Sequence, residues 1–408
     1  MNDQPAALPE AAADPARRSA DLIRWILTEG HASPTISRLV NGVCWRLVDA
    51  GVPLWRASIF ASTLHPQLSG FGWRWWRHNR VIEEVRIPRG VERTPDFLLS
   101  PVRGTIERGE TLHRPLTGTS PDYPLLDEIY REGGTDYLAM PLNRLGRRYP
   151  AVSFVTDHPE GFEPQHVRLL EEIRPALAAI IESAGIRRTA RTLFSIYHGR
   201  QVGERIFDGQ ILRGSLDPLR AVVMATDLRG FTGISDRLPG EAVVQALDDY
   251  FEHVARSVHD AGGHILKFVG DGVLAIFDAD EDKDSDAALA GISAARDLVS
   301  RLETYNAHRA DTNDPVLRTG IGLHLGTVMY GNVGSHDRLD FTAIGPAVNL
   351  AFRLEGMTKE LLRPVIASRA FGEAAGDAMR SLGLYPIRGL TEAEELFGLR
   401  EHDRESTP

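Results

Sequence analysis

Two apolar, strand-like runs in the second half of the chain each lead into an aspartate. The run Ala221–Thr226 ends at Asp227, and the hairpin "LKFVGDGVLAIF" carries Asp271 at its turn. A sheet that holds both strand ends together brings two carboxylates side by side, and Mg²⁺ prefers such oxygen ligands. Either aspartate alone is explained as well by turn formation. The pair, in this context, favours a metal site.

The elements around these aspartates follow a mixed α+β order. Apolar periodicity predicts strand, helix, hairpin, helix, strand, helix and strand from residue 221 onward. Long helices are expected over Glu241–His259 and Ala287–Asn306, and a pair of strands over Arg318–Leu325 and Thr327–Gly331. The order therefore predicts one sheet with helices packed on it.

Two further segments carry residues suited to phosphate chemistry. Gly230, Phe231 and Thr232 precede a predicted helix, where backbone N–H groups can cradle a phosphate; a tight turn with a buried Phe is the alternative. Asn349 and Arg353 lie four residues apart, on one helix face. An arginine there can stabilise charge on a phosphate in transfer, although an isolated pair would be read as surface residues.

Four segments together carry a family resemblance. The motifs "TDLRGFT", "LKFVGDGVLAIF", "GIGLHLGTVMYGNVG" and "FTAIGPAVNLAFRLE" resemble the class III adenylate/guanylate cyclase catalytic domain in order and spacing, over about 215–400. The resemblance implies an α+β fold with a ferredoxin-like βαββαβ palm. It also implies a head-to-tail homodimer with two active sites at the interface. The Gly-Gly-acidic-acidic-Phe signature of a diguanylate cyclase is absent from the sequence.

The resemblance also implies a role for each matching residue. Two Mg²⁺ ions per site, with Mn²⁺ as a substitute, would be held by Asp227, Asp271 and the Leu228 carbonyl. Asn349 would orient the ribose and Arg353 would stabilise the α-phosphate. The substrate-binding set is Lys267 and Thr342 for the purine, Gly230, Phe231 and Thr232 near the phosphates, and Arg388 with Arg338 for the terminal phosphates. His264 and His324 receive no catalytic role.

Lys267 and Thr342 favour ATP over GTP. The Lys267 ammonium can donate to the bare ring nitrogen of adenine, and the Thr342 hydroxyl can accept from its amino group, whereas guanine reverses both polarities. The prediction is an adenylate cyclase; the alternatives are a guanylate cyclase and a non-catalytic nucleotide-binding signalling module. Members with Thr at this place are associated with bicarbonate stimulation, which is a hypothesis here. Pro346 and Phe352 depart from the family pattern.

The N-terminal half predicts a separate α+β domain with a weak, GAF-like element order. Its tryptophan-rich segment, with Trp73, Trp75 and Trp76, is interpreted as an aromatic core or a partner-facing patch rather than a ligand cage. A small-molecule regulator of this domain is expected. The predicted boundaries are a flexible tail (1–18), the sensor (19–185), a connecting helix and turn (186–215), the catalytic domain (216–400) and a second tail (401–408).

One helical stretch closes the sensor domain with a possible pairing seam. Apolar residues recur every three or four positions, interrupted by Pro175, at Val167, Leu170, Ile173, Leu177, Ile180, Ile181 and Ala184. The stretch is explained equally by pairing with a second copy through the connecting helices and by packing on its own domain.

The composition limits the kinds of partner and the location that we expect for this protein. The formal net charge of −10, from 46 basic and 56 acidic residues, argues against a nucleic-acid partner. The single cysteine, Cys44, excludes an intrachain disulfide and is read as a buried apolar residue. No apolar run approaches the roughly 20 residues of a membrane span. We therefore expect a cytoplasmic protein.

Overall fold

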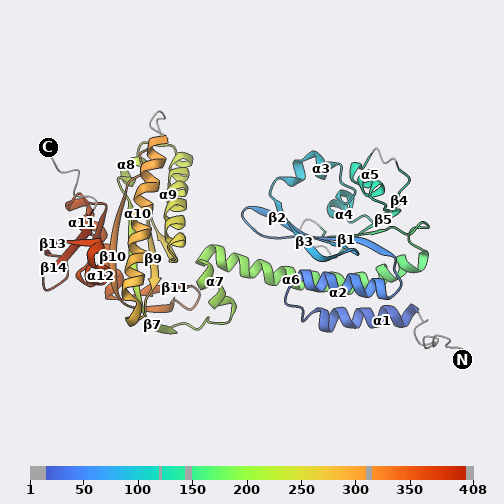
Figure 1. The fold of residues 1–408 in the computed structure, drawn as a ribbon, viewed down its shortest axis with the longest axis horizontal. Coiled ribbons are helices and arrows are strands. Elements are labelled where there is room, and N and C mark those ends of the chain that lie inside the picture. The colour runs from blue at the N-terminus through green and yellow to red at the C-terminus, as the bar shows by residue number, and fades with distance from the viewer. Residues whose placement is uncertain (1–14, 119–121, 143–148, 309–314, 401–408) are drawn as a thin grey trace, which may run out of the picture. The chain divides into compact units, whose positions relative to one another are not determined.

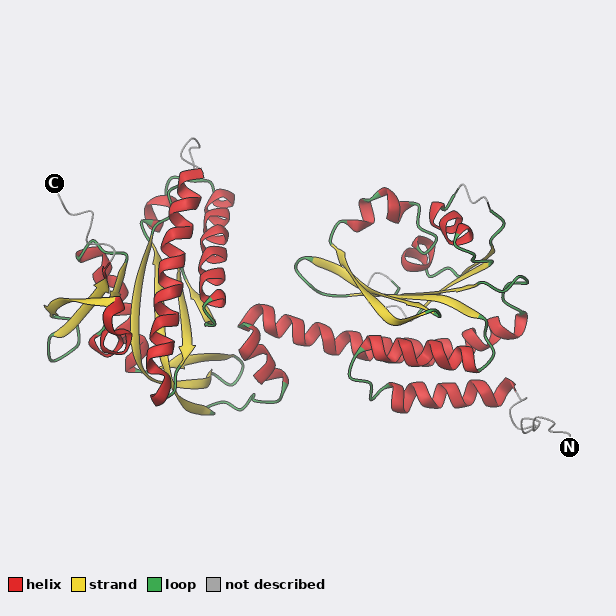
Figure 2. Cartoon of the chain, viewed as in Figure 1, coloured by secondary structure: helices red, strands yellow, loops and turns green. Residues whose placement is uncertain are grey.

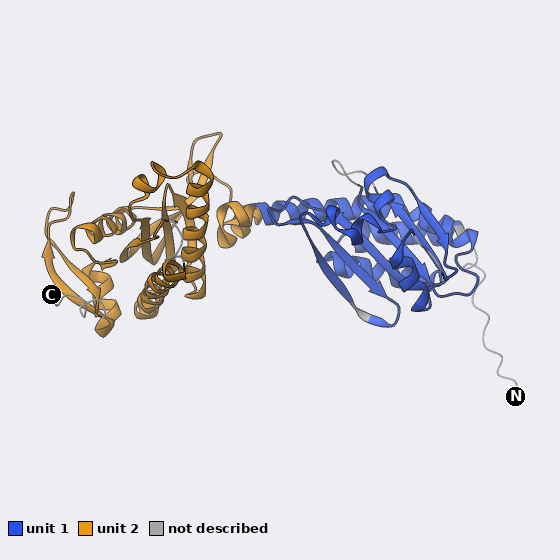
Figure 3. Cartoon of the chain, turned by 90° about the horizontal axis from the view of Figure 1, so that it is seen from above, with its two compact units in different colours: residues 1–193 blue, residues 194–408 orange. Residues whose placement is uncertain are grey.

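The chain forms two units. The computed structural model describes residues 15–118, 122–142, 149–308 and 315–400. The units comprise residues 1–193 and 194–408 (Figure 3), and every hydrophobic cluster of the described residues falls within one unit. Helix α1 (Pro15–Trp25) starts inside the predicted tail, so residues 15–18 are helical and that part of the prediction is wrong. Residues 1–14 and 401–408 lie outside the described residues.

Unit 1 is built on a six-stranded antiparallel sheet. The strand order is β3–β2–β1–β6–β5–β4. The strands are β1 (Leu54–Ser62), β2 (Leu68–Trp76), β3 (Asn79–Pro88), β4 (Leu112–Pro115), β5 (Asp136–Pro141) and β6 (Ala151–Thr156). The helices after α1 are a π-helical turn (Ile26–Gly30), α2 (Ile36–Asp49), a 3₁₀ turn (Val91–Arg93), α3 (Pro95–Leu98), α4 (Arg103–Arg108), α5 (Pro124–Arg131) and α6 (Pro164–His198).

Helices cover both faces of this sheet. α2 and α6 pack on one face, with α1 packed on the outer side of α2, and α4 and α5 pack on the other face (Figures 1 and 2). The α+β prediction for this half is confirmed, whereas the GAF-like resemblance stays a prediction.

The tryptophan-rich strand β2 contributes to the core of unit 1. Trp73 and Trp75 are buried, and Trp45 meets Trp75 edge-on with the ring centroids 5.4 Å apart. The Trp75 indole N–H donates to Asn41 Oδ1 at 3.2 Å, which satisfies its only polar group. The aromatic-core interpretation is therefore confirmed. Cys44 is buried beside them, and burial raises the pKa of its thiol.

Helix α6 buries the predicted seam inside its own unit. Leu170, Ile173, Leu177 and Ile181 belong to the core shared with α2 and the sheet. Pro175 does not end the helix, which runs unbroken for 35 residues. This stretch packs on its own domain, and its buried seam is not available for pairing with a second copy.

Unit 2 contains an eight-stranded sheet. Its order is β13–β14–β12–β10–β7–β9–β8, with β11 paired to β10. The strands are β7 (Leu216–Leu228), β8 (His264–Val269), β9 (Gly272–Asp278), β10 (Thr319–Gly334), β11 (Leu339–Ile344), β12 (Val365–Ala367), β13 (Met379–Tyr385) and β14 (Glu394–Leu399). The helices are α7 (Arg200–Phe207), α8 (Phe231–Ser235), α9 (Gly240–Asp260), α10 (Asp284–His308), α11 (Pro346–Glu360) and α12 (Arg369–Ala375), with 3₁₀ turns at Glu281–Lys283 and Gly376–Ala378.

The central strand β7 shows how this sheet is covered. Val222 and Met224 face the core formed with α9 and α10, while Ala221, Val223 and Ala225 face α7 and α11. The order β10–β7–β9–β8, with α9 and α10 as the connecting helices, is the predicted ferredoxin-like βαββαβ palm. The predicted fold class is confirmed.

One element of unit 2 differs from the prediction. Residues 318–331 were expected to form two strands, but β10 is one strand that pairs continuously with β7. Gly326, which suggested a turn, lies opposite Ala221 within this ladder. Across the described part of both units, no helix is both long enough and apolar enough to cross a bilayer.

Candidate active site

The two predicted metal-binding aspartates lie on adjacent segments of the sheet. Asp227 is the penultimate residue of β7, between Gly272 of β9 and Gly320 of β10. Asp271 lies in the β8–β9 turn, and its carbonyl accepts a hydrogen bond from the Leu228 N–H at 3.2 Å. A Cβ at Gly272 would approach the Thr226 carbonyl oxygen to 2.5 Å, so glycine permits this close approach.

The two carboxylates interact electrostatically. Partial burial raises the pKa of Asp271, and the charge of the neighbouring Asp227 raises it further. Lys359, on α11, places its Nζ 3.5 Å from Asp227 Oδ2. The site therefore combines two carboxylates with one exposed ammonium group. No group of three or more His, Cys, Asp or Glu side chains in the described parts of the chain is placed to hold a metal.

A buried hydroxyl network supports Asp227 from inside the unit. Tyr250 donates to Thr226 Oγ1 at 3.0 Å and shares a 2.9 Å hydrogen bond with Thr319. The Thr319 hydroxyl also donates to the Asp227 carbonyl oxygen at 3.3 Å. Burial raises the pKa of the Tyr250 hydroxyl, so it stays protonated and able to donate. This network fixes the end of β7 that carries Asp227.

An ion pair joins the loop after Asp227 to helix α11. Arg229 Nη1 lies 3.1 Å from Glu355 Oε1, an ion-pair contact without hydrogen-bond alignment, and Nη2 donates to the Glu355 carbonyl at 3.2 Å. The side chains are only 17% and 11% exposed. A Cβ at Gly320 would lie 1.9 Å from Arg229 Nη2, so glycine makes room for the guanidinium.

Glu355 and Lys359 were not among the predicted site residues, and neither was Arg229. Arg229 and Glu355 both lie inside the recognised motifs "TDLRGFT" and "FTAIGPAVNLAFRLE", so opposite charges in two motifs of one site were an available signal. Nothing in the sequence singles out Lys359. Burial raises the pKa of Glu355, while the positive charge of Arg229 opposes that rise.

The predicted phosphate segment lies next to the aspartates. Gly230 adopts a left-handed conformation with φ of 73° and precedes the short helix α8, which begins with Phe231 and Thr232. The Gly230 carbonyl accepts from the Ile234 N–H at 3.1 Å. The turn at Gly230 agrees with the tight-turn alternative, although Phe231 is only partly buried, and the phosphate role of the segment stays a prediction.

The predicted purine-reading residues lie together on β8 and β11. Lys267 Nζ is 2.9 Å from Asp340 Oδ2, and Asp340 is two residues before Thr342 on the same strand. Thr342 is only 4% exposed. Its hydroxyl has no hydrogen-bond partner among the described residues. A buried hydroxyl without a partner carries a desolvation cost.

The remaining predicted residues form a third group. Asn349 is exposed near the start of α11 and Arg353 is half-buried one turn later. A Cβ at Gly389 would lie 2.9 Å from Arg353 Nη2, so the guanidinium rests against the loop that carries Arg388. Arg388 and Arg338 are both exposed. Within the described chain, no hydrogen bond or ion pair links Asn349 or Arg353 to Asp227 or Asp271.

The sequence of unit 2 matches a known family. Residues 219–362 match the model of the adenylate and guanylate cyclase catalytic domain. The matched range contains the aspartate pair, the Lys267–Thr342 group and helix α11. These residues therefore belong to the class III nucleotide cyclase family, as the four motifs predicted.

Curated relatives agree with this assignment. An adenylate cyclase of Anabaena cylindrica is 36% identical over 151 residues, which are 36% of this chain and 29% of that protein. Adenylate cyclase 1 of Rhizobium meliloti (strain 1021) is 36% identical over 176 residues, 43% of this chain and 26% of that protein. The chain thus spans less than a third of either relative. A solved bacterial light-regulated adenylyl cyclase has 30% identity and a TM-score of 0.39, covering 45% of this chain and 92% of that one.

Proposed function

We propose that the protein is an adenylate cyclase that converts ATP to 3′,5′-cyclic AMP and pyrophosphate. The observation that carries the proposal is the pair Asp227 and Asp271, joined at the end of the central strand of a cyclase palm. The adenylate cyclase names of the two relatives support the same activity. Because ATP and reducing conditions are found there, we also propose a cytoplasmic location.

The donor set fits divalent metal. Asp227, Asp271 and the Leu228 carbonyl would hold two Mg²⁺ ions, for which Mn²⁺ can substitute, because all three donors are hard oxygens. The raised pKa of Asp271 fits this role, since a cation between the two carboxylates would relieve their repulsion. When bound, such ions lower the pKa of the ribose 3′-hydroxyl and neutralise charge on the departing pyrophosphate.

The protein residues bind and orient ATP. Asn349 holds the ribose, so that its 3′-oxygen faces the α-phosphorus, and Arg353 stabilises charge on the α-phosphate. Arg388 and Arg338, with the backbone of Gly230, Phe231 and Thr232, bind the other phosphates. The bond between O3′ and the α-phosphorus forms as the bond to the pyrophosphate oxygen breaks. No protein nucleophile is required.

Adenine recognition rests on Lys267 and Thr342. The buried, unpartnered Thr342 hydroxyl accepts from the adenine amino group, and Lys267 donates to the ring nitrogen. Guanine would leave both groups mismatched. The ion pair between Lys267 and Asp340 orients the ammonium group.

The site is completed by a second copy. Within one subunit, no hydrogen bond or ion pair of the described residues joins Asn349 or Arg353 to the aspartates, which supports a head-to-tail homodimer with two shared sites. The N-terminal unit regulates this activity, and bicarbonate remains a candidate stimulator. A bicarbonate titration at fixed pH with no increase in rate would remove that part of the proposal.

The test is turnover of ATP and GTP by the purified chain with Mg²⁺. Cyclic AMP from ATP, in clear excess over cyclic GMP from GTP, is expected, and Asp271→Asn should abolish it. Equal or greater cyclic GMP would identify a guanylate cyclase instead. Nucleotide binding without either product would identify a non-catalytic signalling module.

A further inference from the structure

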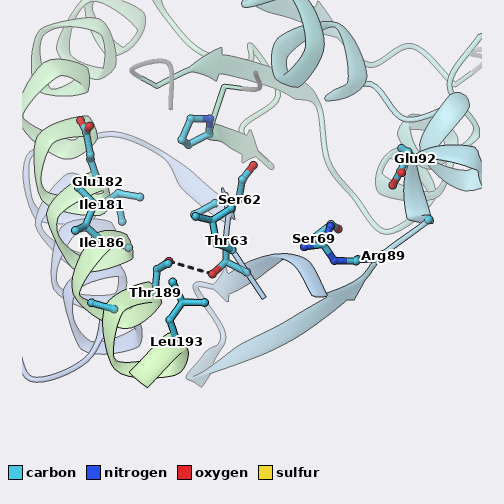
Figure 4. A pocket seen from close by; sticks show the side chains of 16 residues that line it. Ser62, Thr63, Ser69, Arg89, Glu92, Ile181, Glu182, Ile186, Thr189 and Leu193 are labelled. Carbon is cyan, nitrogen blue, oxygen red and sulfur yellow. Dashed lines mark hydrogen bonds between the residues drawn. The ribbon is translucent and has the colours of Figure 1, made fainter. Parts of the chain in front are cut away.

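A cavity of about 720 Å³ lies within unit 1. It is bounded by the end of β1, the start of β2, the segment after β3 and the second half of α6 (Figure 4). Its walls are largely aliphatic, with contributions from Leu64, Pro150, Ile181, Ile186 and Leu193. The volume is in the range of about 300–1,000 Å³ found for small-molecule pockets.

Gly185 keeps one wall of this cavity open. The residue lies inside α6, where glycine costs about 1 kcal/mol of helix stability relative to alanine. A Cβ at Gly185 would meet no other atom within 4 Å, so packing within the unit does not require glycine there. No neighbouring group occupies the position where a side chain of residue 185 would begin, and that space is empty.

The polar side chains that line the cavity differ in whether they have a hydrogen-bond partner. Thr63 and Thr189 satisfy one another through a hydrogen bond of 3.1 Å, drawn in Figure 4. Arg89 donates from Nε and Nη2 to the His65 carbonyl oxygen, at 2.9 and 2.7 Å. Glu182, half-buried on α6, makes no hydrogen bond or ion pair with any described residue.

We propose that this cavity binds a small amphipathic organic cation, whose ammonium group pairs with Glu182 and whose apolar body occupies the space beside Gly185. Glu182 is half-buried in a largely aliphatic lining and has no ion-pair partner among the described residues, and a cationic ligand supplies a counter-charge. Arg89, a basic residue of the same lining, bonds the His65 carbonyl oxygen and forms no described ion pair with Glu182. The ligand would contact the part of α6 that continues through the unit boundary to His198.

Three matched probes test the charge preference. Isothermal titration calorimetry of the full chain would compare 4-phenylbutylammonium, 4-phenylbutanol and 4-phenylbutyrate, which share a phenylbutyl body and differ in charge. We expect the ammonium compound to bind at least about tenfold more tightly than either other probe, a difference of about 1.4 kcal/mol. Glu182→Gln should remove that preference, whereas Glu171→Gln, at an exposed site on the same helix, should preserve it.

A second variant tests the location. Gly185→Leu adds a good helix former whose side chain occupies the space beside residue 185, so we expect weaker ammonium binding with a melting temperature at or above that of the wild type. Equal binding of all three probes, or undiminished binding by Gly185→Leu, would refute the site. If no probe binds and Gly185→Leu disrupts a dimer of the wild-type chain, the cavity is instead a contact surface for a second copy of the chain. Binding is measured without turnover, so its failure is distinguishable from failure of the cyclase proposal.

Discussion

At the scale of single residues, we expect a substitution at Thr342 to lower activity without lowering stability. Its buried hydroxyl has no hydrogen-bond partner in the described part of the chain, whereas the Thr226 hydroxyl accepts from Tyr250. We expect Thr342→Val to leave the free energy of unfolding unchanged or to raise it by about 1 kcal/mol, and to lower ATP turnover. The matched Thr226→Val should lower stability by about 1 kcal/mol. Urea unfolding and initial rates measure both effects, and a clear destabilisation by Thr342→Val would contradict the unpartnered hydroxyl.

His324 makes a prediction about acid stability. Burial lowers its pKa to about 4, and its Nδ1 lies 2.8 Å from Ser368 Oγ. In the unfolded state this histidine takes up a proton near pH 6.5. The contribution of neutral His324 to the free energy of unfolding is therefore fully present above that pH and is lost as the pH falls toward 4. The loss between pH 7 and 5 is about 2 kcal/mol for this group. Urea unfolding should show a shallower acid slope for His324→Gln; parallel slopes would contradict it.

At the scale of elements, the Arg229–Glu355 pair joins the loop after Asp227 to α11. Removing one partner of a buried pair costs roughly 3 kcal/mol or more, because the other charge stays buried. Glu355→Gln should therefore lower stability by about this amount and reduce kcat more than it raises the KM for ATP. The exposed pair Arg256–Glu252 supplies the control, since Glu252→Gln should change stability by less than about 1 kcal/mol. Equal effects of the two variants would show that the buried pair has no special role.

Local patterns predicted most elements of unit 2 correctly. Alternating apolar residues and the Gly-Asp-Gly turn are local signals, and they located β7 to β9 and the two long helices. The pattern failed at β10, because Gly326 was read as a turn although the partner strand β7 continues opposite it. Pairing with a distant strand overrides such a local signal.

Only some residues of the candidate site were predicted, because the others depend on contacts between segments that are distant in the sequence. Motif resemblance identified the aspartates, Lys267 and Thr342. It missed Lys359, because the contact with Asp227 exists only once α11 packs against the sheet. Asp340, which pairs with Lys267 across two strands, was missed for the same reason.

At the scale of the whole molecule, periodicity could not decide what α6 packs against. The seam from Leu170 to Ile181 is apolar in either arrangement, and only the structure shows that it is buried against unit 1. Residues beyond it, including Gly185 and Ile186, line a cavity instead. The same helix therefore contributes to the core of unit 1 in its first half and lines a candidate ligand site in its second half.

The shared-site dimer is tested most directly by mixing two inactive variants. Asp271→Ala removes a metal ligand and Arg353→Ala removes the phosphate contact, so each variant should lack cyclase activity alone. In a mixed dimer one of the two sites carries neither change, and random mixing should restore about a quarter of the wild-type cyclic AMP production. Sedimentation must show that dimers form and exchange. Recovery of activity in the mixture is the result we predict, and no recovery despite exchanged dimers would contradict the shared site.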